Sequence, residues 1–142
     1  MSTTFAELLG AHNIIIPDET LTELEVPVLS GPQRQGDVGI FPRSQVSAAE
    51  LSHMTAIPTT CVQVVRGEAT GNTHLLHPAG RCWWRPIESK AGSVLLGVLH
   101  VDDDAECFLI HTDEHGANGI APGSYEIRGK RELADEIRRV AD

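Results

Sequence analysis

Residues Cys107–Arg128, CFLIHTDEHGANGIAPGSYEIR, decide the fold, because they pass from an apolar strand through a polar loop into a second strand. Phe108–Ile110 is apolar and strand-like, and Gly123–Arg128 alternates, with Tyr125 and Ile127 on one face. The loop between them carries acid, imidazole and amide side chains, namely His111, Asp113, Glu114, His115 and Asn118. No other stretch of the chain is as rich in proton carriers and metal ligands, so we expect a site here.

Ser93–Val101, which precedes this stretch, is the clearest strand in the sequence. Both of its faces are apolar, which predicts a central position in a sheet. Trp83 and Trp84 lie in another predicted strand and must face opposite sides, because side chains alternate along a strand. Turn-rich loops are predicted at 30–36 and 66–72. Apart from Ser93–Val101 and the two strands of Cys107–Arg128, β-branched or alternating residues predict strands at 13–16, 24–28, 37–43, 60–65, 73–77 and 81–87.

Helices are predicted at three places. Thr4–Glu7 is a capping box that opens a helix of about two turns, and Ser47–Glu50 is a second one. The second box favours a helix at 48–53, with an irregular loop as the alternative. Residues 130–141 form an amphipathic helix with an apolar stripe of Leu133, Ile137 and Val140. The chain is therefore predicted to be one mainly β domain, residues 1–142. We expect an antiparallel β-barrel or sandwich with a short N-terminal helix and a C-terminal amphipathic helix.

The composition is that of an acidic globular protein. Of 142 residues, 41% are apolar, which is enough to bury a core. Lys and Arg number 11 against 20 Asp and Glu, so the formal net charge is −9, which opposes binding to a phosphate backbone. The N-terminus lacks the pattern of a signal peptide, and the longest apolar run, Val94–Leu99, is too short to cross a bilayer. We therefore expect a cytoplasmic protein that binds neither nucleic acid nor membrane.

The three cysteines, Cys61, Cys82 and Cys107, are far apart in the sequence, and each lies beside apolar residues. They form no CxxC pair, so neither a zinc ribbon nor a redox motif is indicated. We expect buried, reduced thiols.

Polar residues that could form a site fall in four turn segments. The candidates are Gln35, Asp37, Glu68, Thr70, Asn72, His74, His111, Glu114, His115 and Tyr125. Gly67 and Gly71 allow tight backbone paths in the second segment. Ser124 has no visible partner base, and His100, inside the central strand, is expected to be a core histidine with satisfied hydrogen bonds.

A divalent metal is the cofactor that this set of residues would suit. His111 and His115 have the spacing that joins two ligands on a helix, but a strand-to-loop setting brings them together only if the loop folds back. If His74 meets both, three imidazoles would leave an open position on the ion. Such a site would resemble that of cupin barrels, although their pair of histidines separated by one residue is replaced here by Asn72-Thr73-His74. The alternative is that these are surface histidines on a turn.

Several short motifs follow one another along the chain: Gln35-Gly36-Asp37-Val38, Gly67-Glu68, Thr70-Gly71, His74, His111, Glu114-His115, Pro122-Gly123, Tyr125 and Arg131-Glu132. Their order and spacing resemble those of a family of small uncharacterised proteins from bacteria and their phages. The family usually has histidine where Asn72 stands, and Gln-Arg-Glu-Tyr where residues 130–133 stand. The resemblance implies that these segments share a site, and it implies no particular activity.

Three functions fit the sequence. The first is an accessory or binding module, derived from a phage or other mobile element, whose polar loops contact a protein partner or a second copy. The second is a divalent-metal-dependent or acid–base enzyme that uses His74, His111, Glu114 and His115. The third is a structural or oligomeric component in which the polar loops satisfy one another. The sequence shows no activated nucleophile, and Asn72 stands where the resembling family usually has a histidine that could bind a metal. Both observations count against the enzyme and favour the first function.

The net charge of −9 predicts that the protein does not bind nucleic acid at physiological salt. In a gel-shift titration with duplex and single-stranded DNA, we expect no shift. A tight shift that weakens with added salt would contradict this prediction and would indicate a concealed basic face.

Overall fold

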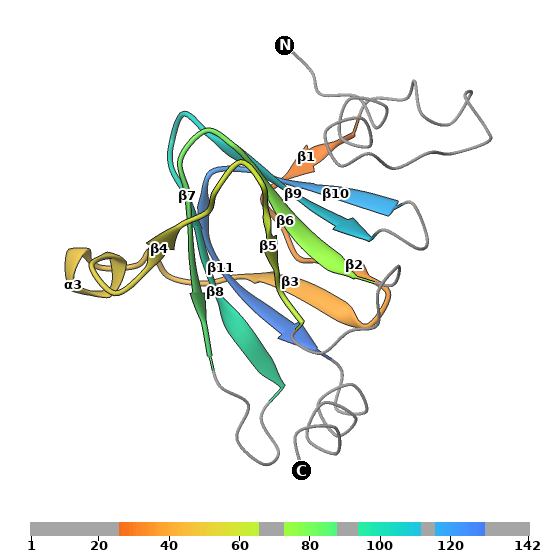
Figure 1. Cartoon of the computed structure of the whole chain (residues 1–142), viewed down its shortest axis with the longest axis horizontal. Coiled ribbons are helices and arrows are strands. Elements are labelled where there is room, and N and C mark those ends of the chain that lie inside the picture. Colours follow the sequence, from red (N-terminus) through yellow and green to blue (C-terminus); the bar gives the residue numbers. More distant parts are fainter. Residues whose placement is uncertain (1–25, 66–72, 88–93, 112–115, 130–142) are drawn as a thin grey trace.

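The computed structural model describes residues 26–65, 73–87, 94–111 and 116–129, which form a sandwich of two β-sheets (Figure 1). The large sheet has the order β2 (Gln33–Gln35), β3 (Val38–Pro42), β11 (Gly123–Gly129), β8 (Leu95–Val101), β7 (Cys82–Pro86) and β4 (Thr55–Ala56). The small sheet has the order β1 (Val28–Leu29), β10 (Gly116–Ile120), β9 (Glu106–His111), β6 (His74–Ala79) and β5 (Val62–Gln63). Neighbouring strands are antiparallel except β1, which runs parallel to β10.

The mainly β prediction is confirmed, and the sandwich is the form that it takes. Within the described ranges, no backbone ladder joins the two sheets into a closed barrel. The predicted N-terminal helix, the strand at 13–16 and the C-terminal helix lie outside the described residues.

β8 has the central position that its apolar faces predict. It is paired with β11 on one side and β7 on the other. Leu99 and Val101 face the other sheet and are fully buried, while Val98 and His100 lie on the outer face of the large sheet, also buried. A strand that is buried on both faces is largely apolar, and this is why the sequence alone predicted the central strand.

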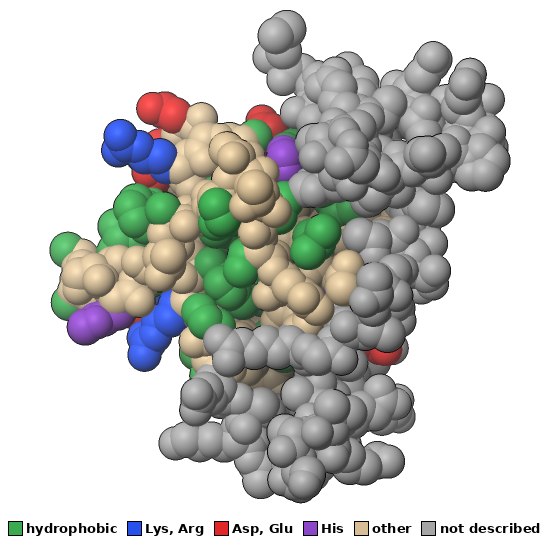
Figure 2. Space-filling view, in the orientation of Figure 1, with side chains coloured by type: hydrophobic (Ala, Val, Ile, Leu, Met, Phe, Trp, Pro, Cys, Tyr) green, Lys and Arg blue, Asp and Glu red, His purple; other side chains and the backbone are tan. Residues whose placement is uncertain are grey.

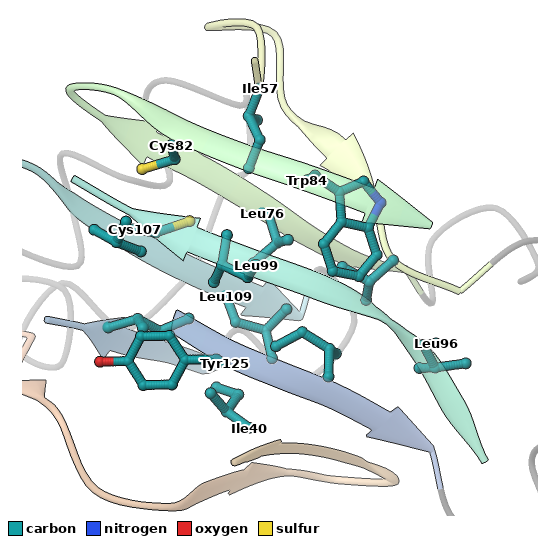
Figure 3. Close-up of a cluster of buried hydrophobic side chains, with 14 of the residues drawn as sticks. Ile40, Ile57, Leu76, Cys82, Trp84, Leu96, Leu99, Cys107, Leu109 and Tyr125 are labelled. Carbon is teal, nitrogen blue, oxygen red and sulfur yellow. The ribbon is translucent and has the colours of Figure 1, made fainter. Parts of the chain in front are cut away.

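The core fills the space between the sheets (Figure 3). Side chains from both sheets contribute to it, among them Ile40, Leu76, Leu99, Leu109 and Tyr125, each at most 2% exposed. In the close-up, Cys82 and Cys107 lie towards one end of this cluster, and Trp84 and Leu96 lie towards the other. Because aromatic residues are few, close packing of aliphatic side chains supplies most of the buried area.

A short helix, α3 (Ala48–Leu51), stands out from the large sheet at the left of Figure 1. The predicted capping box is present, since the Ser47 hydroxyl accepts from Glu50 N and the Glu50 carboxylate accepts from Ser47 N. Val46 and Met54 pack on Val98 of β8, with partly buried Leu51 in the same cluster. This confirms the helix over the alternative of an irregular loop, with an earlier end than predicted.

Several strand predictions were wrong in detail. The 30–36 loop contains β2, and the polar loop after His111 contains β10. β5 is shorter than predicted, β4 was not predicted, and β6 runs on through Pro78 to Ala79. Pro78 is tolerated because β5 pairs only with Leu75 and Leu76, so no ladder hydrogen bond to β5 is lost there.

Trp83 and Trp84 face opposite sides of the large sheet, as predicted. Trp84 lies in the core, and Trp83 packs with the α3 cluster on the outer face. Gly97 makes room for the Trp84 ring, since a Cβ at this position would lie 2.5 Å from Trp84 Cζ2 and 2.7 Å from the Arg85 carbonyl oxygen. The core therefore depends on the absence of a side chain at residue 97.

No helix among the described residues has the length and apolar character needed to cross a membrane.

We predict that Gly97→Ala lowers the free energy of unfolding by about 1–3 kcal/mol, because the added methyl group forces the Trp84 ring or the β7 backbone to move. Gly31→Ala is the matched control, since a Cβ there meets nothing within 4 Å. Urea denaturation of both variants checks this, and equal midpoints for the two would contradict it.

Candidate functional site

His74 and His111 lie side by side on two neighbouring strands of the small sheet, β6 and β9. They are direct partners in the β6–β9 register, and their ring centroids are 4.3 Å apart with the planes tilted by 52°. Each side chain lies on the inner face, because residues two apart on a strand share a face. His74 is two residues from the core residue Leu76, and His111 is two residues from the core residue Leu109. The contact between His74 and His111, one of the arrangements that the sequence left open, is therefore present. We call this end of the sandwich, where β6 begins and β9 ends, the histidine end.

The exposed fractions of His74 and His111 are 5% and 4%. An imidazole offers one donor and one acceptor when neutral, and two donors when protonated. Two such rings in contact can share or exchange a proton, hold an ion by their lone pairs, or contact a polar ligand. The pair is thus a chemically versatile feature at the edge of an apolar core.

Gln35 connects the large sheet to the histidine end. Its Nε2 donates to the Leu109 carbonyl oxygen at 2.8 Å and to Asn118 Oδ1 at 2.9 Å, so β2 is bound to β9 and β10. A Cβ on Gly116, the partner of His111 in the ladder, would lie 3.9 Å from the same Nε2. The amide of Gln35 is therefore close to the strand position opposite His111.

Gln33 and Asn118 extend this contact into a chain of three amides. Gln33 Nε2 donates to the Gly119 carbonyl oxygen at 2.8 Å, and Asn118 Nδ2 donates to Gln33 Oε1 at 3.2 Å. We call Gln33, Gln35 and Asn118 the amide bridge. It joins the edge of the large sheet to the small sheet by hydrogen bonds that each involve an amide side chain.

The oxygen of the Gln35 amide differs from its nitrogen in its hydrogen bonding. Oε1 is buried and has no hydrogen-bond partner among the described residues, although the residue is only 5% exposed. Exchanging the two amide atoms would point an oxygen at the Leu109 carbonyl, so the two donated bonds fix the orientation. A buried acceptor without a donor is costly, which makes Oε1 a position where a ligand could bind.

Gly36 and Asp37 form the tight turn between β2 and β3. Gly36 has φ 58° and is one of the few residues in the left-handed region, which suits the first position of a two-residue hairpin turn. Asp37 is exposed at this turn. The motif Gln35-Gly36-Asp37 thus combines a buried amide with a hairpin that positions it.

The other predicted site residues are not all brought to this place. Tyr125 lies in the core, where its hydroxyl donates to the Ala121 carbonyl oxygen at 2.7 Å and burial raises its pKa. Its hydroxyl therefore holds the turn that leads from β10 into β11. The remaining predicted site residues fall outside the described residues: Glu68, Thr70, Asn72, Glu114 and His115.

Ser124 has a partner base, so the prediction that it lacks one was wrong. Its Oγ lies 2.9 Å from His100 Nδ1, and His100 Nε2 lies 3.2 Å from Asp102 Oδ1. The carboxylate favours a proton on Nε2, which leaves Nδ1 to accept from the Ser124 hydroxyl. The prediction that His100 is a satisfied core histidine is confirmed.

This serine, histidine and aspartate arrangement holds the chain in place. Ser124 Oγ also accepts from Val46 N at 3.0 Å, and Ser124 is only 4% exposed. Its oxygen is thus committed to the segment that leads into α3, and an attacking serine needs an accessible oxygen. Sequence could not show this contact, because His100 and Ser124 meet only through the β8–β11 register.

No group of three or more His, Cys, Asp or Glu side chains in the described ranges could hold a metal ion. His74 and His111 alone would supply two ligands of the predicted set.

Figure 2 shows how charge is distributed on one face of the molecule. Apolar side chains gather in the middle of the visible described surface, and the Lys and Arg side chains drawn there lie apart from one another at its margin. The described part of this face therefore has no continuous basic surface.

Residues 34–130 match a family described as a domain of unknown function, DUF8820. The chain belongs to this family. The DUF8820 region includes Gln35, His74 and His111, and it includes the Ser124–His100 contact. No curated protein and no solved structure matches the chain.

We predict that Gln35→Ala lowers the free energy of unfolding by about 1–3 kcal/mol, because Leu109 and Asn118 lose a buried donor. Arg34→Ala, at the exposed neighbouring position, should change it by less than about 0.5 kcal/mol. Chemical denaturation checks both, and a neutral Gln35→Ala would show that the amide bridge does not stabilise the sandwich.

Proposed function

We propose that this DUF8820 domain is a binding module that docks a protein partner at its histidine end. The observation that carries the proposal is the buried Gln35 Oε1, an acceptor without a donor among the described residues, at the same end of the sandwich as the two inward-facing imidazoles. Backbone N–H groups of a partner segment are donors of the kind that such an oxygen accepts. Polar groups at the end of an apolar core provide orientation, and the core edge provides contact area.

The surroundings of Ser124 and Cys61 support binding over covalent catalysis. Ser124 is buried and its oxygen accepts a backbone N–H, while burial raises the pKa of the Cys61 thiol to about 11. Neither group is poised to attack a substrate at neutral pH.

The resemblance in motif order to small proteins of bacteria and their phages supports an accessory role for the module in a mobile element. A second copy of the chain is one partner that fits this role. The partner surface would then be self-complementary, as in most symmetric dimers.

A divalent transition metal at the histidine end is a second candidate. The contact between His74 and His111 favours it, since neighbouring imidazoles are common ligands of zinc and related ions. In this proposal His115 completes the set, and the ion gives the module a metal-dependent hydrolytic or acid–base activity.

We predict that peptides selected from a random display library on the folded domain bind at the histidine end. Their binding should fall at least about tenfold with His111→Ala, which removes a contact worth about 1.4 kcal/mol or more. His53→Ala, at an exposed position near α3, is the control and should leave binding unchanged. Fluorescence anisotropy with the selected peptides measures both.

Selected peptides that bind His111→Ala and the unchanged protein equally would overturn the docking site. Concentration-dependent sedimentation would distinguish a second copy as the partner. A folded His111→Ala variant, shown by an unchanged circular dichroism spectrum, is required for the comparison.

For the metal candidate, we predict that zinc, nickel or manganese raises Tm and that a chelator reverses the rise, because the ion binds only the folded state. Binding should weaken at acidic pH, since an imidazole must be neutral to bind a metal. His111→Ala should abolish the response and His53→Ala should retain it. No change in Tm with any of these ions excludes the metal site.

A further inference from the structure

The outer face of the large sheet carries an exposed aromatic ring on β3. Phe41 lies on this face, because it is next to the core residue Ile40 and side chains alternate along a strand. It is 36% exposed, and Leu29 is the other exposed large apolar side chain among the described residues. A single exposed apolar side chain is common on protein surfaces, so the surroundings of Phe41 are what distinguish it.

Gly39 gives the ring a fixed place on the sheet. A Cβ at this glycine would lie 2.5 Å from Phe41 Cε2 and 2.9 Å from Phe41 Cζ. The ring therefore lies back over the backbone of residue 39, in space that any other side chain would fill. A ring that rests against the backbone has less freedom to lose when a partner binds to it.

Two arginines flank this ring. Gly39 pairs with Arg34 of β2 on one side and with Arg128 of β11 on the other, so both arginines share its face of the sheet. The Arg128 guanidinium carbon, Cζ, is 6.0 Å from the centroid of the Phe41 ring. We call Arg34, Phe41 and Arg128, which lie across three neighbouring strands, the aromatic–arginine row.

The row has an excess of positive charge in an acidic protein. Arg34 is exposed and forms no ion pair with another described residue. Arg128 Nε donates to Glu126 Oε2 at 2.9 Å, and the side chain of Arg128 is still 46% exposed. Two guanidinium groups thus lie beside one carboxylate, whereas the whole chain has a formal charge of −9.

We propose that the aromatic–arginine row is a second docking surface, which binds a short acidic segment of a partner protein with an aromatic side chain between its carboxylates. Guanidinium groups bind carboxylates through paired N–H donors, and the aromatic side chain of the partner covers the Phe41 ring. Aromatic residues and arginine are also the types enriched in protein interfaces. This goes beyond docking at the histidine end, because His74 and His111 face the core and the row faces outward.

The dimensions of the row favour a short peptide segment. Its two arginines are on strands two positions apart, which separates their backbones by about 10 Å. In an extended peptide, residues four apart are separated by about 13 Å and share a face with the residue midway between them. Acidic side chains two residues before and after an aromatic one can therefore reach both guanidinium groups. A nucleic-acid strand would extend beyond the row, where the overall charge of −9 opposes its phosphates.

The test titrates the isotope-labelled, unchanged protein with the capped peptide Asp-Asp-Trp-Asp-Asp and follows backbone amide resonances by NMR. We expect saturable shifts that centre on Arg34, Gly39, Phe41 and Arg128. Lys-Lys-Trp-Lys-Lys and Asp-Asp-Ala-Asp-Asp should each bind at least about tenfold more weakly. The overall charge favours the lysine peptide, so a preference for the acidic one must come from a local positive surface.

Substitutions in the row should weaken binding of the acidic peptide. Phe41→Ala and Arg34→Glu should each reduce the affinity at least about fivefold. Gly39→Ala should reduce it as well, because it keeps the ring and both arginines but displaces the ring. The NMR spectrum of each variant shows whether it is folded.

Three variants outside the row are the controls and should leave the affinity unchanged. Leu29→Ala removes the other exposed apolar side chain, and Arg85→Glu reverses an exposed arginine of β7. His111→Ala removes an imidazole of the histidine end, so its effect separates the two docking surfaces.

Several results would overturn the proposal. These are no saturable shifts at about 1 mM acidic peptide, equal affinity for the lysine peptide, and full affinity in both Phe41→Ala and Arg34→Glu. Shifts that centre on the histidine end and disappear with His111→Ala would assign the peptide to that site instead. Binding of a single-stranded oligonucleotide that is lost with Phe41→Ala, without binding of the acidic peptide, would make the row a nucleic-acid site.

Discussion

The packing of β8 against β9 across the sandwich is the contact on which the rest of the structure depends. The two strands are consecutive in the chain, yet they lie at or near the centre of different sheets, and their inner residues share one core. The connection between them is short and is closed by a hydrogen bond from Ala105 N to the Asp102 carbonyl oxygen at 2.9 Å. The β6–β7 connection lies against it, since a Cβ on Gly80 would be 2.8 Å from Ala105 Cβ. Two corners packed together in this way hold the sheets face to face.

The local sequence pattern predicted the elements whose own residues carry the signal of burial or of a helix start. β8, β3, β7 and α3 were found because their apolar residues or caps carry the signal within a few positions. β2 and β10 were missed for the opposite reason. Gln33–Gln35 and Gly116–Ile120 are polar or glycine-rich, and they are strands because the amide bridge and the neighbouring ladders hold them. Such tertiary stabilisation leaves no periodic trace in the sequence.

The candidate site was predicted in part for a related reason. The histidines were singled out by residue type, and the proximity of His74 and His111 was one arrangement among several that a β fold allows. Register decides between them, and it is set by packing along whole strands. The same applies to Ser124 and His100, which are distant in sequence and adjacent only in the folded chain.

The amide bridge gives one seam of the sandwich a distinct character. A backbone ladder forms with almost any residue, whereas this seam consists of the side chains of Gln33, Gln35 and Asn118. Its strength is therefore encoded residue by residue. Single substitutions at these three positions can loosen or tighten the join between the sheets. The strength of this join can therefore change gradually in evolution while the fold stays the same.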